Sequence, residues 1–268
     1  MSTDQPSSKA VTYASYLKTD ELLELQKPLS DGPEHDEMLF IIIHQVYELW
    51  FRQIIHEITH LQAVLESNDT PGSLATLKRI LTILKTLVSQ IDILETMTPV
   101  SFNSFRSRLE SASGFQSAQF REVEFLLGHK KQSMLRHHPE GSRGAKRLGE
   151  LLDAPTVYDS FLRYLAENGY AIPESMLARD FTQPIEPSAD IRQVLLDIYR
   201  EDPLRAMVCE HLVDLDEGLQ EWRYRHVKMV ERTIGAKIGT GGSEGAEYLR
   251  KTLFQPLFPD LWDIRSEL

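Results

Sequence analysis

Long stretches of this sequence place apolar residues three or four positions apart, and alternating strand-like runs are hard to find. Because an α-helix turns once in about 3.6 residues, this spacing gathers apolar side chains on one helical face. The sequence therefore predicts an all-α fold. No internal repeat or linker separates independent halves, so we expect residues 13–268 to form a single helical domain that follows a flexible N-terminus of residues 1–12.

Two long helices are expected to form much of the core. The first begins near Glu34 and carries apolar residues from Leu39 to Leu65, and the second extends from about Pro203 to Arg232. Shorter helical patterns occupy residues 13–26, 74–94, 101–109, 116–127 and 156–167. Prolines between residues 169 and 187 predict an irregular connection, and the glycine-rich residues 235–245 predict a loop before a short helix.

Charge and composition narrow the classes of partner. The 268 residues carry a formal net charge of -11, which argues against nucleic acids or an anionic membrane as partners. The longest apolar run, residues 38–43, is far too short to span a bilayer, and the polar first ten residues lack the apolar core of a signal peptide. A single cysteine, Cys209, fits a reducing compartment. We therefore expect a cytoplasmic protein that binds a small molecule or another protein.

The histidines suggest two different metal sites. His56, Glu57 and His60 form an HExxH pattern, in which the two histidines of one helix face can bind zinc while the glutamate acts as a general base. The pattern fixes only three positions, no convincing third ligand follows, and an exposed helix face is the competing interpretation. A zinc hydrolase and a surface helix both remain open on this motif.

A second interpretation rests on His226, which lies on the apolar seam of the last long helix. A haem site needs only one neutral imidazole within an apolar cavity, although a lone histidine in this setting is usually a hydrogen-bonded core residue. His44 follows Phe40 by one helical turn, so both side chains project to the same side of the helix. They can line a pocket together, or His44 can be another core histidine.

Three further features have both an ordinary and a functional interpretation. Phe102 and Arg106 lie four residues apart on one helix face, where the arginine is either a solvated charge or a ligand for an anion. Thr240 lies in the segment GTGGS, which is either a flexible turn or a loop that closes over a ligand. Tyr13 and Tyr16 would share a face of the first helix, in the core or at an interface.

Five segments in order along the chain together resemble the tryptophan 2,3-dioxygenases, from about Tyr13 nearly to the C-terminus. They are TYASYLKTDELLELQ, HDEMLFIIIHQVYELWFRQIIHEI, FNSFRSRLESASGFQSAQFREVEFLLG, WRYRHVKMVERTIGAKIGTGGSEG and FPDLWDIRSEL. The resemblance implies an all-α fold whose long core helices form a pocket for haem b. It implies one haem per subunit. It also implies cleavage of the indole C2–C3 bond of L-tryptophan by O2 to give N-formylkynurenine, the first step of the kynurenine pathway of tryptophan degradation.

The resemblance also assigns roles to the histidines and their neighbours. His226 matches the axial ligand of the haem iron, and His44 matches the catalytic histidine that hydrogen-bonds the indole N–H. Phe40 matches an aromatic residue that packs against the indole. Ser113 matches a serine near the haem edge, and the HExxH segment has no zinc role in this family, so the zinc hypothesis loses most of its weight.

Substrate recognition and assembly are implied in the same way. Arg106 matches the arginine that pairs with the substrate carboxylate, and Thr240 matches the threonine of a loop that contacts the charged end of the amino acid. Phe102 stands where some members have tyrosine, so a hydroxyl contact to the carboxylate is missing. Tyr13 and Tyr16 belong to an N-terminal helical segment that is exchanged with a neighbouring subunit, which implies a homotetramer.

Within the haem dioxygenases, an indoleamine-type enzyme with broader substrates is the nearest alternative to a tryptophan-specific one. The segments FIIIH and GTGGS favour the tryptophan-specific group.

Overall fold

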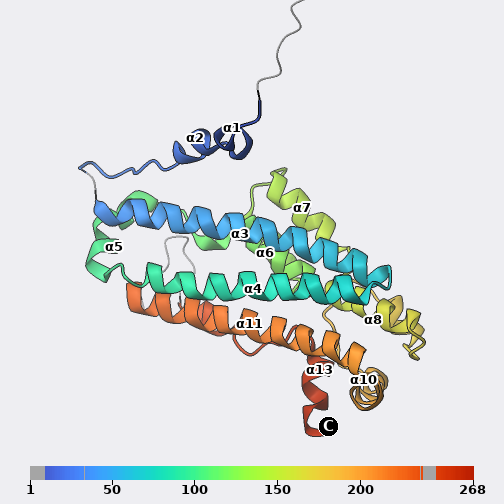
Figure 1. The fold of residues 1–268 in the computed structure, drawn as a ribbon. Coiled ribbons are helices and arrows are strands. Elements are labelled where there is room, and N and C mark those ends of the chain that lie inside the picture. The colour runs from blue at the N-terminus through green and yellow to red at the C-terminus, as the bar shows by residue number, and fades with distance from the viewer. Residues whose placement is uncertain (1–9, 33, 236, 238–245) are drawn as a thin grey trace, which may run out of the picture.

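The computed structural model describes residues 10–32, 34–235, 237 and 246–268, and every regular element among them is helical (Figure 1). The all-α prediction is confirmed. The longer helices are α3 (His35–Glu66), α4 (Thr70–Leu94), α6 (Ala118–Leu126), α7 (Arg143–Leu152), α8 (Val157–Glu167), α10 (Ala189–Glu201) and α11 (Pro203–Ile234). The shorter ones are α1 (Tyr13–Leu17), α2 (Thr19–Leu23), α5 (Pro99–Phe105), α9 (Glu174–Leu177), α12 (Ala246–Arg250) and α13 (Pro259–Asp263). Turns of 3-10 helix are η1 (Arg106–Leu109), η2 (Gly114–Gln116), η3 (Gln132–His137) and η4 (Ile264–Ser266).

The helices α3, α4 and α11 lie side by side along most of their length, with α4 in contact with both of the others (Figure 1). Local sequence signals fix where two of them begin. The Asp69 side chain accepts a hydrogen bond from the Gly72 N–H at the start of α4, and Asp202 accepts one from the Arg205 N–H at the start of α11. Such caps satisfy amide groups that have no partner within the helix.

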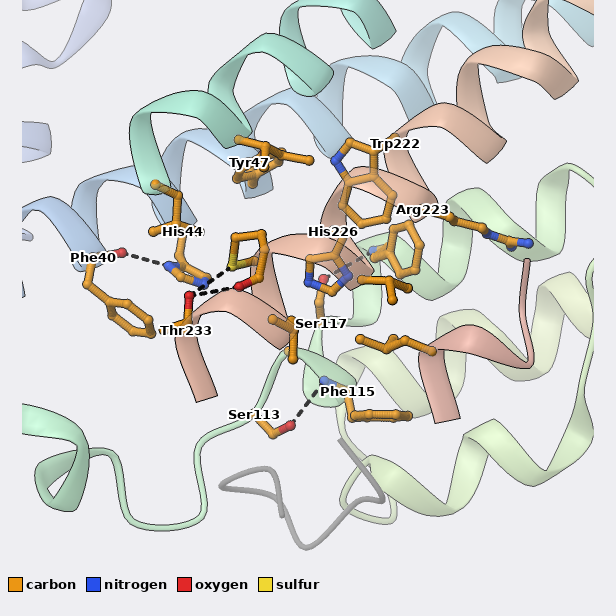
Figure 2. Close-up of a pocket in the computed structure, with 18 of the residues that line it drawn as sticks. Phe40, His44, Tyr47, Ser113, Phe115, Ser117, Trp222, Arg223, His226 and Thr233 are labelled. Carbon is orange, nitrogen blue, oxygen red and sulfur yellow. Dashed lines mark hydrogen bonds between the residues drawn. The ribbon is translucent and has the colours of Figure 1, made fainter. Parts of the chain in front are cut away.

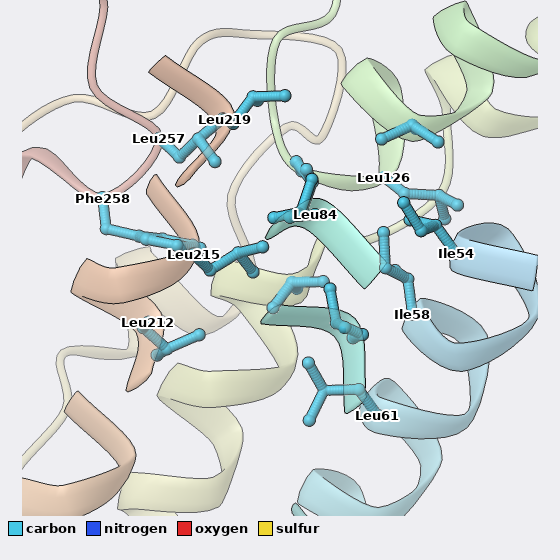
Figure 3. Packing of buried hydrophobic residues seen from close by; sticks show 14 of the residues in the cluster. Ile54, Ile58, Leu61, Leu84, Leu126, Leu212, Leu215, Leu219, Leu257 and Phe258 are labelled. Carbon is cyan, nitrogen blue, oxygen red and sulfur yellow. The ribbon is translucent and has the colours of Figure 1, made fainter. Parts of the chain in front are cut away.

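The core lies where these three helices meet α6 and the C-terminal segment (Figure 3). Ile58 and Leu61 of α3 are fully buried, as are Leu212 of α11 and Phe258 before α13. Since burial of one large aliphatic side chain contributes on the order of 1.5–3 kcal/mol, this shared core holds the site-bearing helices in fixed register. The apolar spacing that predicted α3, α4 and α11 is the spacing of these buried residues.

The N-terminal segment differs from its prediction. Residues 13–26 were expected to form one helix, but the chain breaks into α1 and α2 at Lys18, which has the left-handed backbone angles φ 54 and ψ 41. No residue in either short helix is buried, and the pair lies apart from the body of the fold, above α3 in Figure 1. Little of this chain packs against the segment, so packing does not favour one continuous helix over two short ones.

Two of the longer helices, α7 and α10, were absent from the sequence expectation. The buried residues of α10 are Ile191, Val194, Leu195, Leu196 and Ile198, which do follow helical spacing in the sequence. Conversely, two residues that were expected to be buried are not. Ile42 and Leu49 belong to the predicted apolar stripe of α3 but are 43% and 55% exposed. Within the described residues, no helix combines the length and apolar character needed to cross a bilayer.

Candidate active site

One large cavity opens between the N-terminal half of α3, the segment from α5 to α6, and the C-terminal half of α11 (Figure 2). Its volume is about 280 Å³, whereas a single water needs roughly 10–15 Å³ on the same scale. The walls are predominantly apolar and aromatic, and they include Phe51, Phe120 and Trp222. The cavity is therefore suited to a large, flat, mostly apolar ligand.

His226 is presented to this cavity by α11. Its imidazole stacks on the indole of Trp222, one turn earlier, with ring centroids 5.1 Å apart and planes 7° from parallel. Burial lowers the pKa of His226 to about 4, and the nearby His44 and Arg121 act in the same direction. The imidazole is thus neutral at pH 7, and it has no hydrogen-bond partner among the described residues. A neutral, unpartnered imidazole on a cavity wall has the chemistry of a metal ligand.

His44 lies on the cavity wall formed by α3, as predicted. The N–H of its Nδ1 donates to the Phe40 carbonyl at 2.7 Å, so Nε2 is the acceptor nitrogen of the neutral ring. Burial lowers the pKa of His44, although the Phe40 carbonyl and the Glu48 carboxylate oppose the shift. The ring borders the open cavity and is accessible from it, so Nε2 can accept a hydrogen bond from a ligand.

An aromatic group surrounds this end of the cavity. The ring of Phe40 lies 4.2 Å from that of His44, and 5.8 Å and 5.5 Å from those of Phe102 and Phe105. Arg106 follows Phe102 by one turn, and its backbone N–H donates to the Phe102 carbonyl at the end of α5. Phe102 and Arg106 both line the cavity.

The remaining predicted residues are distributed differently. Ser113 lines the cavity and caps η2, where its hydroxyl accepts a hydrogen bond from the Phe115 N–H at 3.4 Å. Tyr13 and Tyr16 are 78% and 77% exposed and do not border the cavity of their own chain. Thr240 lies outside the described residues.

The HExxH pattern does not form a metal site. His56 and His60 are exposed, whereas Glu57 is buried and bonded to Arg79 at 3.1 Å and to Gln53 at 2.7 Å. Across the described ranges, no group of three histidine, cysteine, aspartate or glutamate side chains could hold a metal ion. Glu57, which a zinc hydrolase would need as a base, forms an ion pair with Arg79 instead.

Sequence reasoning missed three charged residues at the inner end of the cavity. Arg121, Glu124 and Arg223 all line the cavity and are 7%, 7% and 4% exposed. Their burial follows from the packing of α6 against α11, so the sequence alone gave no sign of it. The aromatic side chains Phe120 and Trp222 were also missed as neighbours, although their rings lie only 4.9 Å apart.

Comparison with known proteins decides the family. The sequence model of the family described as tryptophan 2,3-dioxygenase matches residues 2–207 and 194–268, nearly the whole chain. The chain belongs to the tryptophan 2,3-dioxygenase family. This confirms the resemblance that the five sequence segments indicated.

Several relatives match over nearly their full length. A tryptophan 2,3-dioxygenase of Herpetosiphon aurantiacus is 59% identical over 261 residues, which cover 97% of this chain and 100% of the relative. One from Anaeromyxobacter sp. strain K is 58% identical, with 97% of each chain covered. One from Caulobacter vibrioides is 44% identical, with 96% of this chain and 98% of the relative covered. Family membership therefore extends across the whole site and is not confined to one motif.

Proposed function

We propose that this chain is a haem-dependent dioxygenase that cleaves the indole C2–C3 bond of L-tryptophan with O2 to give N-formylkynurenine. The observation that carries the proposal is the neutral imidazole of His226, which has no hydrogen-bond partner in the described part of the chain, in the same cavity as His44, Phe40 and Arg106. Membership of the tryptophan 2,3-dioxygenase family supports it independently.

The residues of the cavity fit haem b. His226 would supply an imidazole ligand to the haem iron, and its low pKa keeps the nitrogen lone pair free at pH 7. Phe51, Phe120 and Trp222 supply apolar walls for a macrocycle. The parallel stack of Trp222 on His226 restricts rotation of the imidazole. When bound, haem b supplies the oxygen chemistry, which no side chain can perform alone.

His44 is assigned to the indole end of the substrate. Because Phe40 occupies the Nδ1 proton, Nε2 presents a lone pair, which matches the donor character of an indole N–H. The ring of Phe40, 4.2 Å from the imidazole, provides a flat surface for the indole. The two residues therefore orient the bond to be cleaved and hold the indole proton in a defined direction.

Arg106 is assigned to the carboxylate end of the substrate, and Thr240, which lies outside the described residues, is assigned to the same charged end. A guanidinium can bind a carboxylate through two parallel hydrogen bonds, so it fixes direction as well as position. Phe102, one turn before Arg106, has no hydroxyl to share the carboxylate, so the arginine carries more of the binding here. Contacts at both ends of the amino acid make catalysis largely a matter of positioning.

Ser113 and the N-terminal tyrosines complete the proposed site. Ser113 is assigned to the haem edge, where its hydroxyl lies on the cavity wall. Tyr13 and Tyr16 are assigned to the indole pocket of a neighbouring subunit in a homotetramer. Their exposure of 78% and 77% supports this assignment, because large aromatic residues on an otherwise unpacked segment gain most from burial against another chain.

One absorption experiment tests the proposed function. Protein purified with its cofactor is expected to show a Soret band, and addition of L-tryptophan in aerated buffer is expected to produce the absorbance of N-formylkynurenine. Zinc analysis of the same sample distinguishes the alternative. Stoichiometric zinc without a chromophore would instead identify a zinc hydrolase and refute the proposal.

A further inference from the structure

A buried ionic cluster in the wall of the cavity joins α6 to α11. The Glu124 carboxylate accepts hydrogen bonds from Arg121, one turn earlier on α6, and from Arg223 of α11 at 2.9 Å. Arg223 is further fixed by the Thr252 carbonyl at 3.0 Å and by Nδ1 of His129 at 2.9 Å. The cluster therefore links helices that lie far apart in the sequence.

The charges in this cluster do not balance. Two guanidinium groups share the single carboxylate of Glu124, and burial together with Arg223 lowers the pKa of His129 to about 4, so this imidazole is neutral at pH 7. Asp216 also acts on Arg223, but Glu124 is the only carboxylate that bonds to Arg121 among the described residues. Because an uncompensated charge in a protein interior is costly, a cluster of this kind calls for an anion.

Arg121 is the member of the cluster with an unused hydrogen-bond donor among the described residues. Its Nε atom is buried and has no hydrogen-bond partner among the described residues, whereas both terminal nitrogens of Arg223 are hydrogen-bonded. The void behind the cluster measures only about 10 Å³, which is room for about one water. A water can hydrate the guanidinium but cannot neutralise it, whereas the large cavity, which Arg121 also lines, has room for an anionic group.

The position of Arg121 points to one end of that cavity. Its guanidinium lies over the rings of Phe115 and Phe120, at 5.4 Å and 5.3 Å from their centroids, and Phe120 contacts the Trp222 that stacks on His226. The charge of Arg121 also acts on the imidazole of His226. Arg106, by contrast, lies with Phe102 at the aromatic end formed by Phe40.

We propose that Arg121 binds a carboxylate of the cofactor, a propionate group of haem b, and that the Arg121–Glu124–Arg223 cluster is the positioning element that orients the haem about its bond to His226. The inference rests on the proposed function, since it needs haem in the cavity. Haem b carries two propionates, and a carboxylate beside Arg121 would both use its free donors and neutralise the excess charge. The carboxylate of tryptophan is already assigned to Arg106.

The test compares haem b with its dimethyl ester, in which both propionates are uncharged. Each is loaded into the apoprotein, and its release to an excess of a haem-scavenging globin is timed from the absorption spectrum. The wild type is expected to release the ester about 10- to 100-fold faster than haem, the range for one charged hydrogen-bonded contact. Arg121→Gln is expected to release the two cofactors at rates within about threefold of each other.

Two further variants separate the possible outcomes. Glu124→Gln removes the competing carboxylate at unchanged size, so it is expected to widen the ratio of the two release rates beyond that of the wild type. This expected change in the ratio is opposite in direction to the change expected for Arg121→Gln, so general destabilisation of the fold cannot produce both results. Arg106→Gln is expected to keep the wild-type ratio.

The proposal is overturned if Arg121→Gln keeps the full preference for haem, if Glu124→Gln leaves the ratio unchanged or smaller, or if Arg106→Gln abolishes the preference. The last result would assign the propionate to Arg106. Failure of the wild type to bind either cofactor would contradict the proposed function itself, so the two failures are distinguishable.

Discussion

Replacement of His44 by alanine tests how this cavity recognises an indole. The Nδ1 proton of His44 is bonded to the Phe40 carbonyl at 2.7 Å, which leaves Nε2 as the acceptor that faces the cavity. His44→Ala therefore leaves an indole N–H without a partner in a largely apolar pocket. Such a loss costs roughly 1–3 kcal/mol, so kcat/KM for L-tryptophan is expected to fall about 5- to 150-fold.

A second substrate isolates this hydrogen bond from other effects of the substitution. In 1-methyl-L-tryptophan the indole nitrogen carries a methyl group and cannot donate, so the same variant is expected to change its kcat/KM by no more than about threefold. Haem content, measured from the Soret band, is expected to be unchanged because His44 binds substrate and not iron. His56→Ala is the matched control, since it replaces an exposed histidine on the same helix.

The result that would refute this reasoning is equal loss of activity toward both substrates, because a hydrogen bond to the indole N–H cannot matter to a substrate without that proton. Loss of haem from His44→Ala would also contradict the assignment, because it would place this histidine on the iron.

Three other variants probe the site, its pH dependence and its assembly. Arg106→Ala is expected to lower kcat/KM for L-tryptophan by about 100-fold or more, but to have little effect on tryptamine, which lacks the carboxylate; an equal loss for both would remove Arg106 from carboxylate binding. Folding holds His129 neutral with a pKa of about 4, below its unfolded value of about 6.5. The unfolded chain thus binds more protons, and stability is lost as pH falls through this range. Since His129 is partly exposed, His129→Asn is expected to lose about 1–2 kcal/mol less than the wild type between pH 7 and pH 5 in urea unfolding of the apoprotein; an unchanged loss would contradict the cause assigned. Tyr13→Ser combined with Tyr16→Ser is expected to weaken the tetramer in sedimentation and to lower activity in parallel, and an intact, fully active tetramer would rule out the exchanged segment.

The predictable parts of the fold are those with a continuous buried face. Ile58 and Leu61 on α3, and Leu212 on α11, repeat at helical spacing and are fully buried, so periodicity alone located these helices. The break at Lys18 could not be predicted, because it involves neither glycine nor proline and lies in a segment in which neither helix has a buried residue. The exposure of Ile42 likewise depends on what covers α3 and not on its own helical phase.

The site divides in the same way. Phe40 and His44 were paired correctly, because residues four apart must share a helix face. The i, i+3 pair Arg121 and Glu124 has the pattern of an ordinary surface ion pair, and only the approach of Arg223, 99 residues from Glu124, buries it. When the role of a charged residue depends on contacts between distant helices, no local sequence pattern identifies it.

The central claim is that His226 supplies the axial ligand of a haem in this cavity, and a cavity variant tests it most directly. His226→Gly removes the imidazole, while α3, α4 and the hydrophobic core between the long helices are expected to remain packed. The variant is expected to lose the ferrous spectrum of the wild type, and added imidazole is expected to restore it by occupying the vacated space. An unchanged ferrous spectrum in His226→Gly without imidazole would contradict the claim, because the iron would then be held by another residue.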